Sequence, residues 1–456
     1  MDILIIAFLT IALAITFGAI IKKFNPTVTL LVAGLLLIAV AYFFGISKLP
    51  LKNPSGYLII DLFKIITDAF KSTFNGLGLY ILTIGGFAYF IEKVGSGQTL
   101  VYYAIKPLKK FKNPYVVLML AFYFGVFLNI FIDSAAGLGL LLATTIYPIL
   151  RGLGISKLAA ASAISTTGSF AVSPLSSLGA LNADLLGMPL HEYFFSYKIY
   201  TSIAIIIFAG LAHYAWHKYS DAKLAPANNT TDDLHESNLK PGHPLLAIIP
   251  IIPIFVMFIP ISIKSIKMDI ATVMFLSLLI SIIIVGLVKK LPLKDLFSLT
   301  GEYFTGMSKI VSVVILIVAG QIFAKGLISM GAVTYLVEIG HSLQIGGIGI
   351  SLIFATCAFL LAAMVGSGNA AVIAFANLSP DVATQFSVPL MMFLIPLHDI
   401  AILGRPIAPV AGVIIAVAGI AKINVMDLAK RNCVPMISTA IFAFIVNLIL
   451  MPILLK

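Results

Sequence analysis

Two short polar stretches interrupt long apolar segments in the second half of the chain. They are Val365-Gly366-Ser367-Gly368-Asn369-Ala370-Ala371 and, about forty residues later, Leu403-Gly404-Arg405-Pro406-Ile407-Ala408-Pro409. In hydrocarbon every backbone N–H and C=O needs a partner, so a broken helix persists only where protein or a water-filled cavity covers it. A charged side chain at that depth costs at least ~2.5–3.5 kcal/mol and by default marks a functional site. Two such breaks, one of them with Arg405, predict a binding site for an anion.

The composition identifies an integral membrane protein. The 456 residues are 60% hydrophobic and 10% charged, with a mean hydropathy of +1.10, and a soluble core has no room for that much apolar surface. Apolar runs of about 20 residues recur, the length that crosses ~30 Å of hydrocarbon as a helix, and the alternating ~10-residue segments of membrane β-barrels are missing. The net charge of +11 does not indicate nucleic-acid binding, because the lysines lie at the ends of apolar segments, where the positive-inside rule places them.

The cysteines and the start of the chain agree with this class. Cys357 and Cys433 lie in apolar segments and form no metal-binding or disulfide pattern. The chain begins Met1-Asp2-Ile3-Leu4, without the basic residues that open a signal peptide. We therefore expect the first apolar segment to be a membrane span.

The first half of the chain, residues 1–216, predicts five crossings and one re-entrant hairpin. The apolar run at about 115–150 is too long for one span and is interrupted by Asp133-Ser134-Ala135-Ala136-Gly137. It therefore predicts a hairpin whose non-helical tip is buried in protein. The segment at about 158–186 contains two stretches rich in Ser and Thr, and it predicts a broken helix. The remaining spans are expected at about 3–21, 27–46, 76–92 and 198–216, with a separate amphipathic piece between the second and third of these.

A polar linker, residues 217–243, is followed by a second half, residues 244–456, with the same order of segments. Its hairpin is expected at about 347–380 and its broken helix at about 387–418. The other spans of this half are expected at about 245–263, 269–288, 310–328 and 433–455, with an interfacial piece at 291–307 before the third of these. The whole chain therefore predicts an all-α polytopic membrane protein with about 10 transmembrane helices and two re-entrant hairpins.

The repetition is also visible in single residues. Pro174 precedes Pro409 by the same number of positions as Glu192 precedes Asp427, and we call this separation the repeat offset. Each half has an odd number of crossings and a hairpin that returns to its own side, so the second half must be inverted relative to the first. Two inverted repeats with discontinuous helices near the midplane are typical of secondary transporters.

The distribution of basic residues predicts the orientation. Most of the 29 Lys and Arg residues fall on the side of the membrane that carries Lys22 and Lys23, and the positive-inside rule makes that side cytoplasmic. Both termini then lie outside, and the linker 217–243 is cytoplasmic. The first hairpin opens inward and the second outward.

If the halves pack about a pseudo-two-fold axis, four breaks converge: hairpin tips at 133–137 and 366–370, and unwound stretches at 165–177 and 398–409. Half-helix N-termini and Arg405 suit a carboxylate, and helix C-termini with unwound carbonyls suit a small cation. We expect substrate contacts from Ser134, Ala135, Thr166, Thr167, Ser173, Pro174, Ser367, Gly368, Asn369, Arg405 and Pro406. We expect ion coupling at Asp133, Ser165 and Asp399, with a possible Na⁺ site at Asp133, Ser134, Ser367 and Asn369.

These regions resemble a known family. The stretch from Leu403 to Val413, continuing through Ala416 to Ile423, resembles the corresponding region of the anaerobic C4-dicarboxylate uptake family, type C. The stretches Gly366-Ser367-Gly368-Asn369-Ala370 and Ser134-Ala135-Ala136-Gly137-Leu138 are similar to that family's two hairpin tips. The resemblance covers essentially the whole chain in length and span order.

The resemblance implies a member of the ion-transporter superfamily. Its known folds are homodimers with a scaffold and an elevator-like transport domain, here in the cytoplasmic (inner) membrane of a bacterium. The implied substrates are succinate, fumarate, malate or aspartate. They would move with Na⁺ or H⁺ by symport, or by exchange (antiport), without a cofactor.

Several residues have a second interpretation. The Gly-Ser-Gly-Asn stretch is also typical of a close helix–helix contact, where small residues line the interface. The matching break in the first half favours a hairpin tip that binds a ligand. Arg405 binds a substrate carboxylate, or it snorkels or forms a structural pair such as one with Asp399, and its unwound surroundings favour the substrate. Asp133 is a coupling group or a helix cap, and the sequence does not decide between them. His398 titrates near neutral pH or is hydrogen-bonded structure, and the second is commoner for a lone histidine.

Other functions compete with a dicarboxylate carrier. One is an ion-coupled carrier of an amino acid or another carboxylate. Another is a Na⁺/H⁺ antiporter, which we expect to place two or more buried acids at its site; in this sequence only Asp133 and Asp399 qualify, and they lie beside an arginine. An intramembrane enzyme would need a His-Glu-x-x-His helix or a Gly-x-Ser-x-Gly elbow, and the sequence has neither. A channel is a further alternative, but two non-identical hairpins and an inverted repeat favour a carrier. The sequence has no P-loop, so ATP does not drive transport directly. The sequence therefore predicts a secondary carrier and no enzyme.

Overall fold

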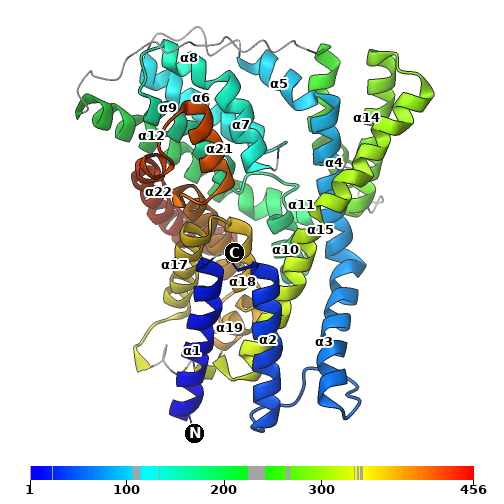
Figure 1. Cartoon of the computed structure of the whole chain (residues 1–456), viewed down its shortest axis with the longest axis vertical. Helices are drawn as coiled ribbons and strands as arrows, with labels where there is room; N and C mark the ends of the chain where they lie inside the picture. The colour runs from blue at the N-terminus through cyan, green and yellow to red at the C-terminus, as the bar shows by residue number, and fades with distance from the viewer. Residues whose placement is uncertain are drawn as a thin grey trace.

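The structure of the chain is a computed structural model (Figure 1), and it describes residues 2–22, 24–105, 113–132, 134–223, 242–262, 268–332, 334–335, 338 and 342–455. Over these residues the secondary structure is helical and contains no strand. Eight helical segments in the described part are long and apolar enough to cross a membrane. The prediction of an all-α, multi-pass membrane protein is therefore confirmed, whereas the number of crossings beyond these eight segments stays a prediction.

One set of helices, which we call the long-helix group, contains the longest continuous elements. Its members are α1 (Asp2–Ile21), α2 (Pro26–Phe43), α3 (Leu58–Thr73), η1 (Phe74–Gly78), α4 (Leu79–Val94), α13 (Ile252–Ser262), α14 (Ile270–Lys289) and α15 (Leu293–Ser329). A π-helical turn, η1, joins α3 to α4, and α15 packs along α2, α3 and α4 (Figure 1). Two shorter elements, η5 (Pro244–Ile251) and α5 (Ser96–Ile105), pack against each other.

Backbone contact holds α2 against α15. A Cβ atom on Gly34 would lie 2.6 Å from the carbonyl oxygen of Ile322, and one on Gly326 would lie 2.6 Å from the carbonyl oxygen of Gly34. Any larger side chain would push the helices apart, so glycine is required at both positions. Small residues at helix crossings are the usual means of close packing in membranes.

Two predicted interfacial pieces are parts of longer helices. We expected a span at about 76–92 with a separate amphipathic piece before it, and the structure joins them from Leu58 to Val94. The piece expected at 291–307 is likewise continuous with the next span in α15. Neither junction contains a proline, and the glycines within them do not end the helix.

The remaining helices form the broken-helix group. From the first half it contains α6 (Pro114–Asn129), α7 (Ala135–Thr145), α8 (Tyr147–Gly152), α9 (Lys157–Thr166), η3 (Thr167–Ser169), α10 (Ser177–Leu186), α11 (Leu190–Glu192), η4 (Tyr193–Lys198) and α12 (Ile199–Lys223). From the second half it contains α17 (Gly347–Val365), α18 (Gly368–Ala376), α19 (Ser379–Gln385), α20 (Met391–Ala401), η6 (Ile402–Ile407), α21 (Gly412–Ala421) and α22 (Val425–Leu454). The two halves interlock here, because α7 packs on α21 and α12 packs on α22.

The element order recurs at a nearly constant spacing. The repeat offset that relates Pro174 to Pro409 also separates the first residues of α3 and α15, of α10 and α21, and of α11 and α22. The starts of α6 and α17 are two positions closer together than that offset. The division into residues 1–216 and 244–456 as inverted repeats stays a prediction.

One boundary of the expected linker differs in detail. Helix α12 continues to Lys223, which lies beyond the start of the linker expected at residue 217. The greater part of that linker, residues 224–241, lies outside the described residues.

Candidate functional site

Each predicted hairpin tip is a helix–turn–helix break with a capped second helix. Ser134 caps α7, and its Oγ accepts the amide of Gly137 at 3.1 Å. Ser367 caps α18 in the same way, with the amide of Ala370 at 3.3 Å. Serine is favoured at such positions because its hydroxyl accepts from an amide that the helix itself leaves unpaired. The membrane placement of these tips, and therefore their re-entrant character, stays a prediction.

The tips pack directly on the unwound segments of the broken helices. A Cβ atom on Gly168 would lie 2.8 Å from that of Ala135, at the first tip. A Cβ atom on Gly368, at the second tip, would lie 3.2 Å from the Cα atom of Ile402. The two contacts occupy equivalent places in the two halves. Each tip is thus held against the unwound segment of its own half.

A cavity of about 80 Å³ lies between the two broken helices. One water molecule needs roughly 10–15 Å³ measured in the same way, so the cavity has room for a small molecule rather than a large ligand. Its walls combine a polar majority with a few apolar side chains. They are formed by Asn129, Gly168, Phe170, Ala171, Ser173, Ser176, Ser177, Leu178, Asn369, His398, Ile402 and Arg405.

The electrostatics of the cavity favour an anion. Arg405 is the one Lys, Arg, Asp or Glu side chain among the described residues that line it. Its guanidinium donates to the carbonyl oxygen of Gly168 and to Oγ of Ser169 (3.3 Å), which positions it across the first break. The N-terminus of α10 also reaches the cavity, because its cap, Ser176, and its first residues line the wall. First-turn amides have no partner within their helix and carry partial positive charge.

Three of the expected substrate contacts line the cavity: Ser173, Asn369 and Arg405. Ser173 is also held in place, since its hydroxyl donates to the carbonyl oxygen of Ile130 at 2.9 Å. Four further polar side chains line the cavity and were not among the expected contacts: Asn129, Ser176, Ser177 and His398. Ser176 and Ser177 lie within or beside the Ser-rich stretch of the first break, so the sequence signal for them was present.

The other expected contacts lie behind or beside the wall. Ser134, Ala135, Ser367 and Gly368 form the two tips described above. Pro174 is buried beside Ser173. The Thr167 hydroxyl donates to the carbonyl oxygen of Ile164. Asn432 donates to Ser165 at 3.2 Å and to the carbonyl oxygen of Pro406 at 2.8 Å. Asp133 lies outside the described residues, so neither its coupling role nor its part in the Na⁺ site is placed. In the described part of the chain, no three His, Cys, Asp or Glu residues are grouped to hold a metal ion.

Thr166 ends a buried chain of hydrogen bonds that leads away from the cavity. Arginine can only donate, so Nε of Arg431 donates to Nδ1 of His217 (3.1 Å) and leaves that ring its Nε2 proton. His217 then donates to Nδ1 of His213 (2.9 Å), and Nε2 of His213 donates to the Thr166 hydroxyl (3.0 Å). Arg431 in turn pairs with Asp221. Thr166 therefore has a structural role at the end of this hydrogen-bonded chain. The other four members of the chain, His213, His217, Arg431 and Asp221, were not expected from the sequence.

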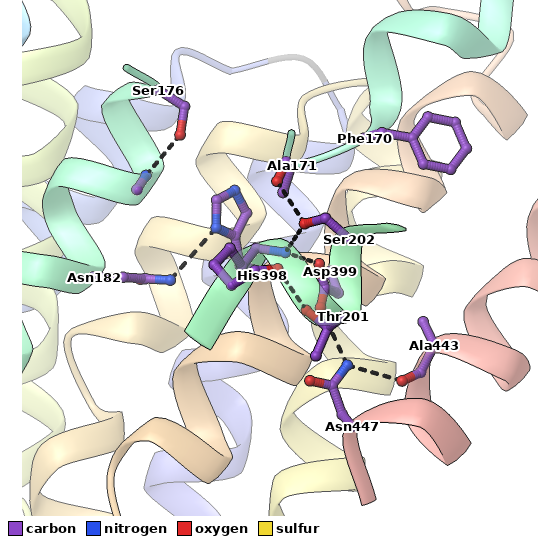
Figure 2. Close-up of polar contacts among 12 residues, drawn as sticks. Phe170, Ala171, Ser176, Asn182, Thr201, Ser202, His398, Asp399, Ala443 and Asn447 are labelled. Carbon is purple, nitrogen blue, oxygen red and sulfur yellow. Dashed lines mark hydrogen bonds and ion pairs between the residues drawn. The ribbon is translucent and has the colours of Figure 1, made fainter. Parts of the chain in front are cut away.

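Asp399 pairs with a lysine that the sequence analysis did not single out. Lys198, at the end of η4, forms a buried ion pair with Asp399, the residue after His398 on α20. The second carboxylate oxygen accepts from Nδ2 of Asn447 at 3.1 Å (Figure 2). Asp399 therefore has Lys198 as its ionic partner, and the alternative in which it pairs with Arg405 does not apply.

The chain is similar to known proteins over almost its whole length. The model of the C4-dicarboxylate anaerobic carrier family, DcuC, matches residues 2–452. A probable anaerobic C4-dicarboxylate transporter DcuC from Vibrio cholerae is 32% identical over 97% of this chain and 98% of its own. The anaerobic C4-dicarboxylate transporter DcuC of Escherichia coli K12 is 30% identical over 95% of this chain and 94% of its own.

The fold is shared with a solved transporter. The crystal structure of the Alcanivorax borkumensis YdaH transporter matches with a TM-score of 0.66 at 13% identity, covering 92% of this chain and 98% of that one. Family and relatives are transporters rather than enzymes, which confirms the expected class and the resemblance. The chain belongs to the C4-dicarboxylate anaerobic carrier family, DcuC.

Proposed function

We propose that the protein is a secondary carrier of C4-dicarboxylates such as succinate, fumarate, malate and aspartate. The observation that carries the proposal is the cavity between the two broken helices, where Arg405 is the one fully charged side chain among the described lining residues. The volume of about 80 Å³ suits a small solute. Family membership supports the substrate class, because the relatives are named as C4-dicarboxylate transporters.

In this proposal each end of the dicarboxylate has its own donors. Arg405 binds one carboxylate, because a guanidinium matches the two oxygens with a fork of N–H groups. The second carboxylate lies at the N-terminus of α10, where Ser176, Ser177 and the first-turn amides donate. Asn129 and Asn369 orient the substrate from the walls. A monocarboxylate would leave one of these two donor groups without a partner and bind more weakly.

Transport in this proposal is movement of the broken-helix group against the long-helix group, by alternating access of the elevator type. The long helices are supported by backbone contact between α2 and α15, and the cavity lies within the broken-helix group. The carrier would be a homodimer in the bacterial cytoplasmic membrane with both termini outside, coupled to Na⁺ or H⁺. Charge bias along the sequence supports the orientation.

The first test is uptake of radiolabelled succinate into proteoliposomes, with Na⁺ and pH gradients imposed separately. We expect saturable uptake that fumarate competes and that one of the gradients drives. Folded protein that takes up succinate under neither gradient would contradict the proposed substrate, and a thermal-shift screen of amino acids and other carboxylates would follow.

The placement of the substrate is tested at Arg405. We expect Arg405→Ala to weaken succinate binding at least tenfold, because a charge-assisted pair contributes about 1.5–3 kcal/mol, and Arg405→Lys to recover only part of it. Arg151 is the matched control, because it holds the carbonyl of Ile155 and does not line the cavity. An Arg405→Ala protein that folds and binds succinate as tightly as Arg151→Ala would place the substrate elsewhere.

A further inference from the structure

Two polar ties connect the broken helices, one from each half. In the first tie, Asn432 on α22 donates to Ser165 (3.2 Å), just before the first break, and to the carbonyl oxygen of Pro406 (2.8 Å), in the second break. The second tie runs from Lys198 to Asp399, just before the second break. It continues to the first break through Ser202 on α12, which accepts from Lys198 at 3.3 Å and donates to the carbonyl oxygen of Ala171 at 3.1 Å. Each tie therefore touches both unwound segments.

The two ties occupy equivalent places but differ in charge. At the repeat offset, Lys198 and Asp399 correspond to positions within one residue of Asn432 and Ser165. The first tie is an amide bonded to a hydroxyl, and the second is an ion pair whose side chains are 1% and 3% exposed. Burying two charges costs several kcal/mol per ion before their attraction is counted, and an uncharged replacement is often as stable. The neutral tie shows that the equivalent junction is held without charge. Stability of the junction alone therefore does not explain why the second tie is an ion pair.

The ion pair is connected to the wall of the cavity. Ser202, which accepts from Lys198, donates to the carbonyl oxygen of Ala171 at 3.1 Å, and Ala171 lines the cavity (Figure 2). On the other side, Asp399 follows His398, which also lines the cavity. A small void of about 10 Å³ touches both Asp399 and Ala171, which is close to the size of one water molecule. The ion pair therefore lies directly behind the wall of the cavity, one hydrogen-bonded side chain away from it.

The contacts of Asp399 favour a proton over a metal cation. Its two oxygens accept from N–H donors, Nζ of Lys198 and Nδ2 of Asn447. A Na⁺ ion needs several oxygen ligands, whereas the partners that these two oxygens have in the structure are N–H donors. The other titratable groups beside the pair are His398 and Tyr193, and both contact Asn182 on α10.

We propose that the Lys198–Asp399 pair is the proton-coupling site of this carrier, an inference that rests on the proposed transport of dicarboxylates. Asp399 takes one proton from water at the cavity when a dianion binds, and returns it to water when the dianion leaves. As the Asp399 O–H bond forms, an O–H bond of a hydronium ion at the cavity breaks, and the reverse transfer to water occurs on release. Lys198 stays an ammonium group throughout.

The charge count explains why the two events reinforce each other. Arg405, Lys198 and Asp399 sum to one positive charge, and a dianion changes that sum to one negative charge. One proton on Asp399 makes the loaded site neutral. The positive charge of Lys198 then balances the negative charge of the second carboxylate across the wall of the cavity. A neutral assembly crosses the hydrocarbon at the lowest electrostatic cost. Linkage is reciprocal, so succinate must bind more tightly as the pH falls.

Proton uptake is measured directly on the purified full-length protein. Succinate is added in weakly buffered detergent solution above about pH 7, where it is a dianion, with a pH-indicator dye present. We expect about one proton taken up per succinate bound, and an affinity that changes by up to tenfold per pH unit. Binding without proton uptake, or binding that requires Na⁺ instead, would overturn the inference and leave the proposed function intact. Folded protein that binds no C4-dicarboxylate would overturn both.

Variants assign the proton to a residue. Asp399→Asn removes the ionic partner of Lys198, so the variant is unstable if the ion pair serves only to hold the fold. We therefore compare it with the double variant Lys198→Gln/Asp399→Asn, which has an uncharged tie like the first one. Both are expected to bind succinate without proton uptake and without pH dependence. A double variant that melts earlier but still takes up one proton would show a structural role and refute the coupling role. Loss of proton uptake in His398→Gln, with retention in Asp399→Asn, would move the site to the histidine and also refute it.

Discussion

Arg405 and Phe170 occupy equivalent positions of the two halves, related by the repeat offset, and both line the cavity. A guanidinium offers five N–H donors, whereas a phenyl ring offers none. At this pair of equivalent positions the second half therefore supplies a charged donor and the first half supplies none. A ligand with two carboxylates has to use neutral donors for its second end, which gives Ser176 and the first turn of α10 their importance in the proposed binding mode.

That importance can be tested at Ser176 without disturbing the helix. Ser176 caps α10 by accepting the amide of Gly179 at 2.9 Å, and Asn or Asp can perform the same capping. We expect Ser176→Asn and Ser176→Asp to melt within a few degrees of wild type. Only Ser176→Asp places a negative charge at the cavity wall, so it should weaken succinate binding at least tenfold in calorimetry. Equal affinities for the two variants would mean that no carboxylate lies near α10.

Single residues were predictable from the sequence only where their type was out of place. Arg405, Asn369 and Ser173 are polar residues inside apolar segments, and all three line the cavity. Partnerships were not predictable, because they join residues far apart in the chain. Lys198 and Asp399 are 201 residues apart, and in the sequence the lysine was one of many at a segment end.

At the scale of elements, the hairpin tips combine a capped helix with a glycine that allows close approach. Gly366 ends α17 in the left-handed region, with φ of 76°, and a Cβ atom there would lie 2.9 Å from the backbone of Ala411. The second tip is therefore seated on the chain just before α21. Ser134 and Ser367 show that the two tips repeat the same capping.

Replacing Gly366 separates seating of the tip from backbone strain. Gly366→Ala adds left-handed strain of about 1–2 kcal/mol and also the collision with Ala411. Gly95 has the same φ of 76° with open space around it, so Gly95→Ala adds the strain alone. We expect both variants to melt at lower temperature and only Gly366→Ala to lose most of its succinate uptake. Equal uptake by both variants would show that the seated tip is not needed for transport.

The order of elements was predictable from the sequence, and their continuity was not. Hydropathy and polar interruptions located the breaks in α9–α10 and α20–α21. The amphipathic pieces before α4 and within α15 looked separate because charged residues lowered their local hydropathy. In the structure a π-helical turn, Phe74–Gly78, joins the first piece to α4. The second piece is part of one unbroken helix, α15. Charged residues do not by themselves end a helix, and α20 and α22 continue even through their interior prolines.

At the scale of the whole molecule, movement between the two helix groups can be tested by cross-linking. A Cβ atom on Gly320 of α15 would lie 2.6 Å from Cγ2 of Ile373 on α18, so the two β-carbons would be within about 4.1 Å, inside the range of a disulfide. With Cys357 and Cys433 first replaced by alanine, Gly320→Cys/Ile373→Cys joins the groups. We expect oxidation to abolish succinate uptake and reduction to restore it.

The control cross-link lies within the broken-helix group. A Cβ atom on Gly139 of α7 would lie 4.0 Å from that of Val413 on α21, so Gly139→Cys/Val413→Cys joins two elements that should move together. Its oxidation is expected to leave uptake largely intact. Full uptake with the α15–α18 cross-link closed would exclude relative movement of the two groups at that interface.

The backbone contact between Gly34 and Gly326 has a consequence for synthesis. The two glycines are separated by most of the chain, and ribosomes add roughly 5–20 residues per second, so α2 is made about 15–60 s before α15 emerges. During that interval the glycine face of α2 has no protein partner and must be covered by lipid or by the insertion machinery. A ribosome that stalls in the second half leaves this face uncovered, so truncated chains should be strong substrates for membrane quality-control proteases.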